Sequence, residues 1–121
     1  MNIITWNVRE LGRPAKRFLV RDFLNLHFAD VCCLQESKLD NISPTLWREI
    51  GGSKLDQFAF VPARGSVGGI IMGWNSGSLY GSLVKIGTFS LTVDFLSRSD
   101  NRIWSCTTVY GPNARALKEV F

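Results

Sequence analysis

The sequence predicts an α/β fold, and three observations support that class. Residues 31–34 are four consecutive apolar residues, a run too short for a helix and apolar on both faces, which is typical of a strand buried inside a sheet. A strand-like segment and a helix-like segment precede this run, so the three together predict a βαβ unit. Further along, residues 89–96 alternate apolar and polar side chains, which indicates a strand with one wet face.

The first predicted strand covers residues 2–8, which are rich in β-branched and aromatic side chains. Pro14 fits the first turn of a following helix, because its missing N–H costs nothing there, and this helix is predicted to run to about Leu26. Arg17 and Arg21 lie one turn apart and are placed on a different side from the apolar stripe. That stripe, at helical spacing, consists of Phe18, Leu19, Phe23, Leu24 and Leu26.

Glu36 comes just after the buried run, at what would be the carboxyl end of a central strand. In an open α/β sheet this is the edge where ligands usually bind. Two strands joined through a helix are parallel with a right-handed crossover, so their carboxyl ends lie on the same side of the sheet. Asn7, near the end of the first strand, is therefore predicted to lie close to Glu36 in space. The alternative is that Glu36 only begins a solvated loop, with which Lys38 is compatible.

The middle of the sequence predicts a short helix followed by two strands. Ser43 and Pro44 are typical of a helix start, and Gly51 and Gly52 end this helix. Strands are predicted at residues 57–62 and 69–74, with a loop between them. The glycines of this region fit a phosphate cradle or a hairpin, and the hairpin is favoured because a full P-loop pattern is missing. They are Gly65, Gly68 and Gly69.

The last third predicts an antiparallel meander. Its strands are expected at residues 82–86, 89–96 and 102–110, with turns at residues 75–78 and 97–101. A Gly-Pro-Asn turn ends the last strand, and residues 114–121 have the pattern of a helix start, with Leu117, Val120 and Phe121 on its apolar side. No internal repeat or linker interrupts the sequence, so residues 1–121 are predicted to form a single domain.

Composition and charge set limits on function without defining it. Apolar residues make up 45% of the 121 residues, which indicates a globular chain. Fourteen Lys and Arg against ten Asp and Glu give a net charge of +4, which favours anionic partners without establishing nucleic-acid binding. Part of the excess lies between Arg9 and Arg21, and a solvated helix face is the favoured explanation of that run.

The three cysteines are not spaced like a pair of metal ligands. Cys32 and Cys33 are neighbours in a predicted strand, so their side chains point to opposite faces and are interpreted as small buried residues. This favours a reducing compartment. No signal peptide opens the sequence, and the expected location is intracellular, nuclear or cytoplasmic. No apolar run reaches the length that crosses a bilayer, so no membrane partner is expected.

Three segments carry a family resemblance: residues 4–8 (ITWNV), 31–37 (VCCLQES) and 109–113 (VYGPN). Together and in this order they resemble the endonuclease/exonuclease/phosphatase superfamily. Within it, the chain is similar to the apurinic-type endonuclease domain of plant LINE-type retrotransposons, and residues 68–74 (GGIIMGW) match that subgroup as well. The resemblance extends over essentially the whole chain.

The resemblance implies the amino-terminal half of a four-layered α/β sandwich of the DNase I-like type, with a mixed β-sheet and flanking helices, as one incomplete domain. It also implies Mg²⁺- or Mn²⁺-dependent cleavage of a phosphodiester, with DNA as the partner. By motif, Glu36 would bind the metal, Asn7 would orient a ligand or water beside it, and Tyr110 and Asn113 would contact the scissile phosphate. Mg²⁺ prefers oxygen ligands and keeps several waters, so one or two carboxylates suffice.

The same residues also have structural explanations. Asn7 fits a turn cap, Tyr110 fits a core aromatic with its hydroxyl at the rim, and Asn113 after Gly-Pro is an ordinary turn residue.

The sequence departs from the family pattern in two ways. Glu10 occupies a position that is usually glycine, which affects the expected tight turn beside Asn7. In addition, the acidic and histidine pairs of the family's second half, which serve the nucleophile and base, do not occur in this sequence. His27 is expected at the end of the first helix, away from Asn7 and Glu36, and is not expected to be the base. Nuclease activity is therefore not expected of this chain alone.

Two other functions are consistent with the sequence. A folded, non-catalytic chain would hold nucleic acid through basic side chains, namely Arg9, Arg13, Arg64 and Arg115. A phosphoesterase of the same superfamily, acting on inositol lipids or small phosphoesters, is the third candidate. Half of a two-sheet sandwich is also expected to leave the inner face of its sheet uncovered, so self-association through that face is expected.

Overall fold

The computed structural model describes residues 1–65 and 67–109. Two helices and seven strands form in these ranges. In chain order they are β1 (Ile3–Asn7), α1 (Pro14–Leu26), β2 (Val31–Gln35), α2 (Pro44–Gly51), β3 (Gln57–Val61), β4 (Ile70–Trp74), β5 (Leu79–Ile86), β6 (Ser90–Ser97) and β7 (Ile103–Val109). The predicted order of elements is confirmed as far as β7, and the helix expected at residues 114–121 lies outside the described residues.

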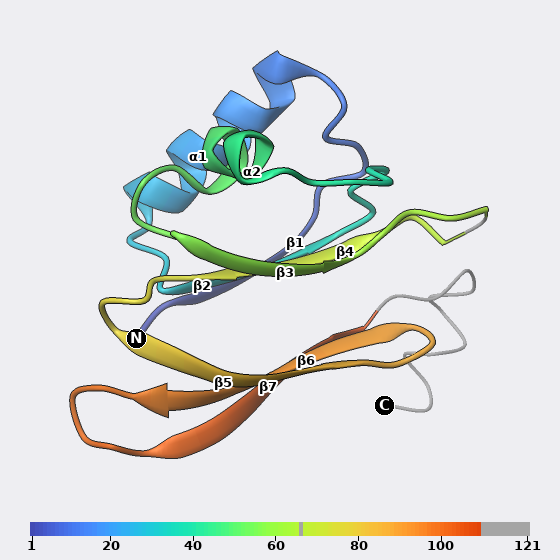
Figure 1. Ribbon diagram of the computed structural model, residues 1–121. Coiled ribbons are helices and arrows are strands. Elements are labelled where there is room, and N and C mark those ends of the chain that lie inside the picture. Colours follow the sequence, from blue (N-terminus) through green and yellow to red (C-terminus); the bar gives the residue numbers. More distant parts are fainter. Residues whose placement is uncertain (66, 110–121) are drawn as a thin grey trace.

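The strands form two sheets. The first has the order β1-β2-β4-β3 and is mixed, because β1 and β2 are parallel while the other pairs are antiparallel. The second, β5-β6-β7, is the predicted antiparallel meander. Figure 1 shows α1 and α2 on one face of the first sheet and the second sheet beneath its other face. The described residues thus form three layers, helix on sheet on sheet.

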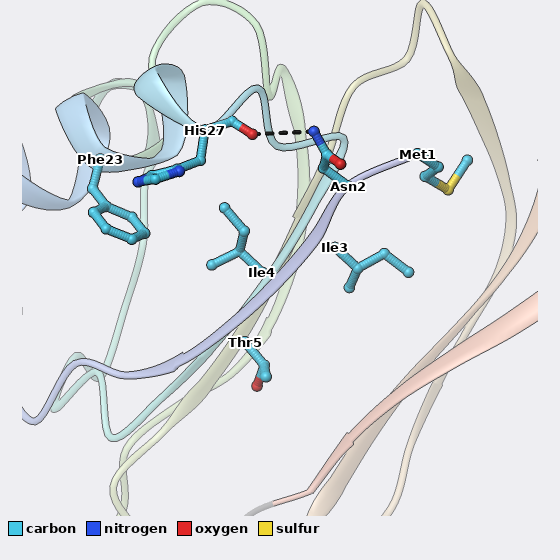
Figure 2. A pocket seen from close by; sticks show the side chains of 7 residues that line it. All are labelled: Met1, Asn2, Ile3, Ile4, Thr5, Phe23 and His27. Atoms are coloured by element: carbon cyan, nitrogen blue, oxygen red, sulfur yellow. Dashed lines mark hydrogen bonds between the residues drawn. The ribbon is translucent and has the colours of Figure 1, made fainter.

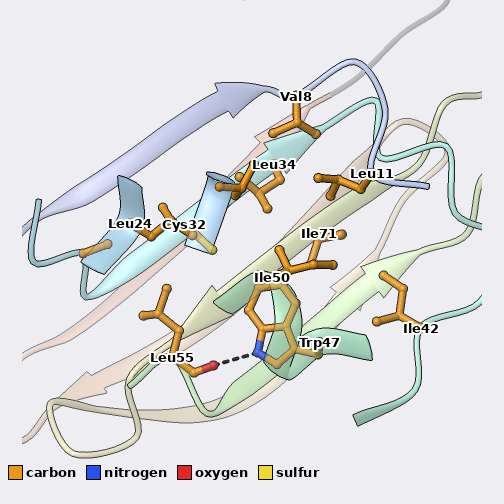
Figure 3. Close-up of a cluster of buried hydrophobic side chains, with 12 residues drawn as sticks. Val8, Leu11, Leu24, Cys32, Leu34, Ile42, Trp47, Ile50, Leu55 and Ile71 are labelled. Carbon is orange, nitrogen blue, oxygen red and sulfur yellow. Dashed lines mark hydrogen bonds between the residues drawn. The ribbon is translucent and has the colours of Figure 1, made fainter. Parts of the chain in front are cut away.

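The helices cover the first sheet through one hydrophobic cluster. Burying such apolar side chains contributes about 25 cal/mol per Å² and is the main force that holds the layers together. The cluster combines both helices, two strands and the loop after β1 (Figure 3), and its central members are Val8, Leu11, Val20, Leu24, Leu34, Trp47, Ile50 and Ile71.

A second hydrophobic cluster joins the two sheets. Its main members are Val31, Cys33, Ile70, Met72, Trp74, Leu79, Leu91, Val93 and Phe95. The expectation that the inner face of the sheet would be left uncovered is therefore wrong. The physical reason is that this chain supplies strands to both sheets, so the two inner faces pack on each other. Cys32 belongs to the helix-side cluster and Cys33 to the inter-sheet cluster, as their alternation predicts.

The apolar stripe predicted for α1 is confirmed at Leu24 and is wrong for its other members, which are exposed. Only Val20 and Leu24 of this helix are buried hydrophobic residues, whereas Leu19 is 55% and Leu26 70% exposed. The reason is that α1 packs on the sheet through the helix face that contains Val20. Phe23 lies at the margin of this contact, where its ring is 4.9 Å from that of Trp6.

Arg17 is an exception to the predicted solvated face. Its side chain is only 11% exposed, because it lies between α1 and α2. One Nη donates a hydrogen bond to the carbonyl of Leu11 at 3.0 Å, and the other is 3.5 Å from the carboxylate of Glu49. Arg17 therefore helps to hold the two helices together and is not available to a partner.

Most element boundaries agree with the sequence. The clearest difference is β5, which begins at Leu79 and not near residue 82, because its pairing with β6 continues past an irregularity between Gly81 and Leu83. The start of α2 is as predicted, and the Ser43 side chain accepts a hydrogen bond from the N–H of Leu46. Neither described helix has the length and apolar character that a membrane-crossing helix needs.

Candidate active site

The carboxyl ends of β1 and β2 lie side by side, as predicted. The two strands are parallel and in register, with Asn7 opposite Gln35, so Glu36 follows directly beside the end of β1. We call this region, formed by Asn7, Arg9, Glu36, Lys38 and Gly68, the Glu36 corner. Because parallel partners in register point to the same face of a sheet, Asn7 shares the inner face with Gln35.

Backbone hydrogen bonds hold the chain around Glu36 from both sides. On one side, the loop after β1 donates from Val8 to the Gln35 carbonyl at 3.0 Å and from Leu11 to the Ser37 carbonyl at 2.9 Å. On the other side, the segment before β4 accepts two hydrogen bonds. Its Gly69 carbonyl accepts from the N–H of Ser37 at 3.3 Å, and its Gly68 carbonyl accepts from the N–H of Lys38 at 2.6 Å. The position of Glu36 is therefore fixed by two separate parts of the chain.

The backbone of the corner is strained. Arg9, Glu36 and Lys38 have φ values of +67°, +57° and +59°, a left-handed conformation that costs a residue with a side chain about 1–2 kcal/mol. Such residues persist only where surrounding contacts determine them, and they gather at functional sites. Glu10 does not need to be glycine, because the left-handed residue of this turn is Arg9.

Gly68 allows a close approach to Glu36. A Cβ atom at this position would lie 3.2 Å from the Cα atom of Glu36 and 3.3 Å from the Nζ atom of Lys38. Gly65 has a different role, since it lies at φ +56° in the β3–β4 hairpin, where Arg64 and Val67 form an isolated bridge. The favoured hairpin explanation agrees with Gly65, whereas Gly68 is a packing position against the acidic residue.

The side chains of the corner can supply oxygen ligands. Glu36 is half-buried, and within residues 1–65 and 67–109 its carboxylate accepts no hydrogen bond and forms no ion pair. Asn7 is exposed, and its Oδ1 atom accepts a hydrogen bond from the N–H of Arg9 at 3.2 Å, so it also caps the turn. A carboxylate and an amide oxygen, carried by the neighbouring ends of β2 and β1, are ligand types that Mg²⁺ and Mn²⁺ accept while they keep several waters. The described ranges contain no cluster of three or more His, Cys, Asp or Glu that would hold a metal by protein ligands alone.

Gln35 connects the corner to the second sheet, a role that the sequence analysis missed. Its Nε2 atom donates to Thr5 Oγ1 at 3.1 Å and to Thr108 Oγ1 at 2.8 Å, which ties β1, β2 and β7 together. The sequence did contain one signal for this role, because Gln35 is a polar residue between the buried apolar run and Glu36. This contact brings the end of β7 to the same side of the molecule as Glu36.

The other predicted site residues are distributed over the surface. Arg9 is exposed at the corner, Arg64 is exposed in the β3–β4 hairpin, and Arg13 is exposed at the start of α1, 4.0 Å from Glu10. Tyr110, Asn113 and Arg115 lie outside the described residues. Lys38 is an additional cation at the corner, and its sequence context identified it only as a loop residue.

His27 lies far from the corner, as predicted. It caps the carboxyl end of α1 and lines a shallow depression of about 710 Å³ at the amino end of β1. Figure 2 shows this depression, in which the side-chain amide of Asn2 donates to the His27 carbonyl at 3.2 Å. The depression contains none of the site residues, because Asn7 lies at the opposite end of β1.

Comparisons with known proteins bear on the family and the fold. The model of the endonuclease/exonuclease/phosphatase family matches residues 4–113. A search of the curated proteins finds no match. Among solved structures, an AP endonuclease of Leishmania major, LMAP, matches with 22% sequence identity and a TM-score of 0.60. The match covers 96% of this chain and 43% of the LMAP chain, so this chain spans less than half the length of that structure.

Proposed function

Because the chain belongs to the endonuclease/exonuclease/phosphatase family, we propose that it is the amino-terminal part of a metal-dependent phosphodiester endonuclease domain. The observation that supports this proposal is the Glu36 corner, where the ends of β1 and β2 lie side by side and the Glu36 carboxylate has no partner among residues 1–65 and 67–109. A retroelement origin is supported by the plant LINE-type likeness of residues 68–74 and 109–113.

In the proposed site, Glu36 would hold Mg²⁺ or Mn²⁺ together with waters, and Asn7 would orient a ligand or water beside it. The ion supplies polarisation of a phosphoryl oxygen and stabilises the charge that develops there. Tyr110 and Asn113 would contact the phosphate, and Arg9 and Lys38 would attract the nucleic-acid backbone. The substrate class proposed is DNA.

We also propose that this chain alone is not an efficient nuclease. Hydrolysis needs a positioned base as well as a metal, and His27 lies at the wrong end of β1 to serve as one. The match to 43% of the LMAP chain supports the view that further residues of the site belong to a second part of the domain.

The test has two readouts on the purified chain. The first is Mn²⁺ titration followed by NMR, in which we expect paramagnetic broadening of the amide signals of Asn7, Glu36 and Lys38. Glu36→Gln should abolish this broadening, because it removes the charge while conserving size. The second readout is plasmid nicking with Mg²⁺, for which we expect no activity above the Glu36→Gln background.

Glu10→Gln is the matched control, since Glu10 follows Arg9 in the same loop and its side chain accepts a hydrogen bond from the N–H of Gly12. In this variant, Mn²⁺ should broaden the same amide signals as in the wild-type chain. If broadening is unchanged in Glu36→Gln or is lost in Glu10→Gln, the assignment of the metal ligand is wrong. Robust nicking that depends on Glu36 would contradict the proposed need for a second part.

A second candidate function is nucleic-acid binding without cleavage. It is favoured by the exposure of Arg9, Arg13 and Arg64 and by the net charge of +4. Binding that weakens steeply with salt, is insensitive to Glu36→Gln and needs no divalent ion would support this function over the first, because phosphate contacts release counterions. Turnover of a small phosphoester but not of DNA would instead favour a phosphoesterase of the same family.

A further inference from the structure

Two cysteines from different sheets meet in the interior. Cys33 of β2 and Cys106 of β7 are 73 positions apart, and their Sγ atoms are 3.8 Å apart. Cys33 is buried, whereas Cys106 is half-buried at the edge of the inter-sheet cluster. Cys32 is buried on the other side of the first sheet, among the residues that contact the helices.

The strands that carry this pair are held together independently of the sulfurs. Two residues further along each strand, Gln35 Nε2 donates to Thr108 Oγ1 at 2.8 Å. Both pairs are separated by 73 positions, so β2 and β7 run side by side in the same direction at this level. The approach of the two sulfurs is therefore part of a regular contact between the strands.

The distance between the sulfurs fits the reduced form of a disulfide site. A disulfide bond is about 2.05 Å long, so the two sulfurs, now 3.8 Å apart, need to approach by roughly 2 Å in total. Disulfides between the two sheets of a β-sandwich are well established in antibody domains. The layered architecture is therefore compatible with such a bond.

The electrostatics of the pair give the two sulfurs different roles. A hydrogen bond between the two sulfurs lowers the pKa of Cys106 from 9.0 to about 7. The same hydrogen bond, together with burial, raises the pKa of Cys33. Burial raises the pKa of Cys32 to about 12, so this thiol is unreactive. Cys106 is half-buried and is the thiol of the pair whose pKa is lowered, so it is the nucleophile that an oxidant would meet first.

We propose that Cys33 and Cys106 form a redox modification site, at which hydrogen peroxide converts the two thiols into a disulfide that joins the two sheets. In the first step the Cys106 thiolate attacks one oxygen of the peroxide, the O–O bond breaks, and the products are a sulfenic acid and hydroxide. In the second step the Cys33 sulfur attacks the sulfenic sulfur, and the departing hydroxyl leaves as water with the Cys33 proton. Both sulfurs are oxidised, and one peroxide is reduced to two waters.

The experiment treats the reduced chain with graded hydrogen peroxide and then removes the excess. Intact-mass analysis should show the loss of two hydrogens, and peptide mapping without reductant should find residues 33 and 106 in one cross-linked product. The number of free thiols should fall from three to one. Oxidation should raise the Tm by at least about 5 °C, because the bond closes a long loop, and dithiothreitol should reverse the rise.

Three variants complete the design. Cys106→Ser and Cys33→Ser should show no reversible Tm shift, whereas Cys32→Ala should behave like the wild-type chain. Each variant is compared with its own reduced form, so a lower stability of the variant does not affect the comparison. The proposal is wrong if all three thiols survive, if the cross-link contains Cys32, or if sulfenic and sulfinic acids accumulate at Cys106 without a disulfide.

Discussion

At the scale of single residues, Trp47 determines how α2 sits on the first sheet. Its indole N–H donates to the carbonyl of Leu55 at 2.6 Å (Figure 3), and the side chain is 2% exposed. The ring lies directly over two glycines, because a Cβ atom at Gly51 would be 2.6 Å from its Cζ2 atom and a Cβ atom at Gly73 would overlap that atom. The indole thus requires glycine in both the helix and the strand.

Gly73→Ala should destabilise the chain by about 2–3 kcal/mol, since overpacking a close-packed core forces side chains or backbone to shift. The measurement is the free energy of unfolding from urea titration. In a Trp47→Phe background the same substitution should cost less than about 1 kcal/mol, because phenylalanine lacks the ring atoms that the new methyl group would meet. Equal costs in the two backgrounds would show that the indole is not the obstacle.

The position of the candidate site could be predicted from the sequence, but its backbone conformation could not. The adjacency of the carboxyl ends of β1 and β2 follows from a general property of parallel strands, and the register confirms it by placing Asn7 opposite Gln35. The left-handed conformation of Arg9, Glu36 and Lys38 has no local signal, since none of the three is glycine. Around Glu36 and Lys38 the backbone is held by the carbonyls of Gly68 and Gly69, which are distant in sequence and accept hydrogen bonds from the N–H groups of Lys38 and Ser37.

At the scale of elements, local chemistry predicted where helices and strands begin and end better than which faces they bury. Pro14 and Pro44 mark both helix starts correctly. The buried face of α1 depends instead on the neighbours it meets, which single-sequence periodicity does not contain. Arg17 illustrates this, because its burial depends on Glu49 and on the Leu11 carbonyl.

The cap of α2 gives a test at this scale. Ser43→Ala should lower the free energy of unfolding by about 1 kcal/mol, because the N–H of Leu46 loses its acceptor at 3.1 Å. Thr45→Ala, at an exposed position in the first turn of α2, is the matched control and should be neutral or slightly stabilising, since alanine favours helices. Urea unfolding of both variants measures the difference. A cost for Thr45→Ala as large as that for Ser43→Ala would contradict the capping role.

At the scale of the whole molecule, one flank of the sandwich is open. Within the described ranges, β1 is an edge strand of the first sheet and β7 is an edge strand of the second. β7 packs against β2 and β4, whereas β6 packs against β4, so β7 is the strand of the second sheet that lies toward β1. The two edges therefore lie on the same flank. Unpaired strand edges are templates for further pairing. Ile3 is 49% exposed at this flank and Ile103 is 79% exposed. We propose that self-association uses these edges, since the inner faces are already covered.

A lysine on the open edge should weaken this association. In sedimentation velocity, the mean sedimentation coefficient of the wild-type chain should rise with concentration, and Ile3→Lys should reduce the rise, because it places repelling charges at the pairing edge. Leu19→Lys is the control, since Leu19 is 55% exposed and belongs to α1, so the substitution adds the same charge outside both sheets. An equal reduction by the helix variant would indicate general hydrophobic aggregation, and a monomeric wild-type chain would contradict the proposal.

The backbone hydrogen bonds that hold the Glu36 corner also have a consequence for synthesis on the ribosome. The amino-terminal βαβ unit leaves the exit tunnel first and can pair its two strands, since domains begin to fold from the amino terminus during translation. The N–H groups of Ser37 and Lys38, however, can form their hydrogen bonds only after the carbonyls of Gly69 and Gly68 have been synthesised. A nascent chain that has emerged only to residue 60 therefore lacks these acceptors, and the backbone around Glu36 reaches its final conformation late, when β4 pairs with β2.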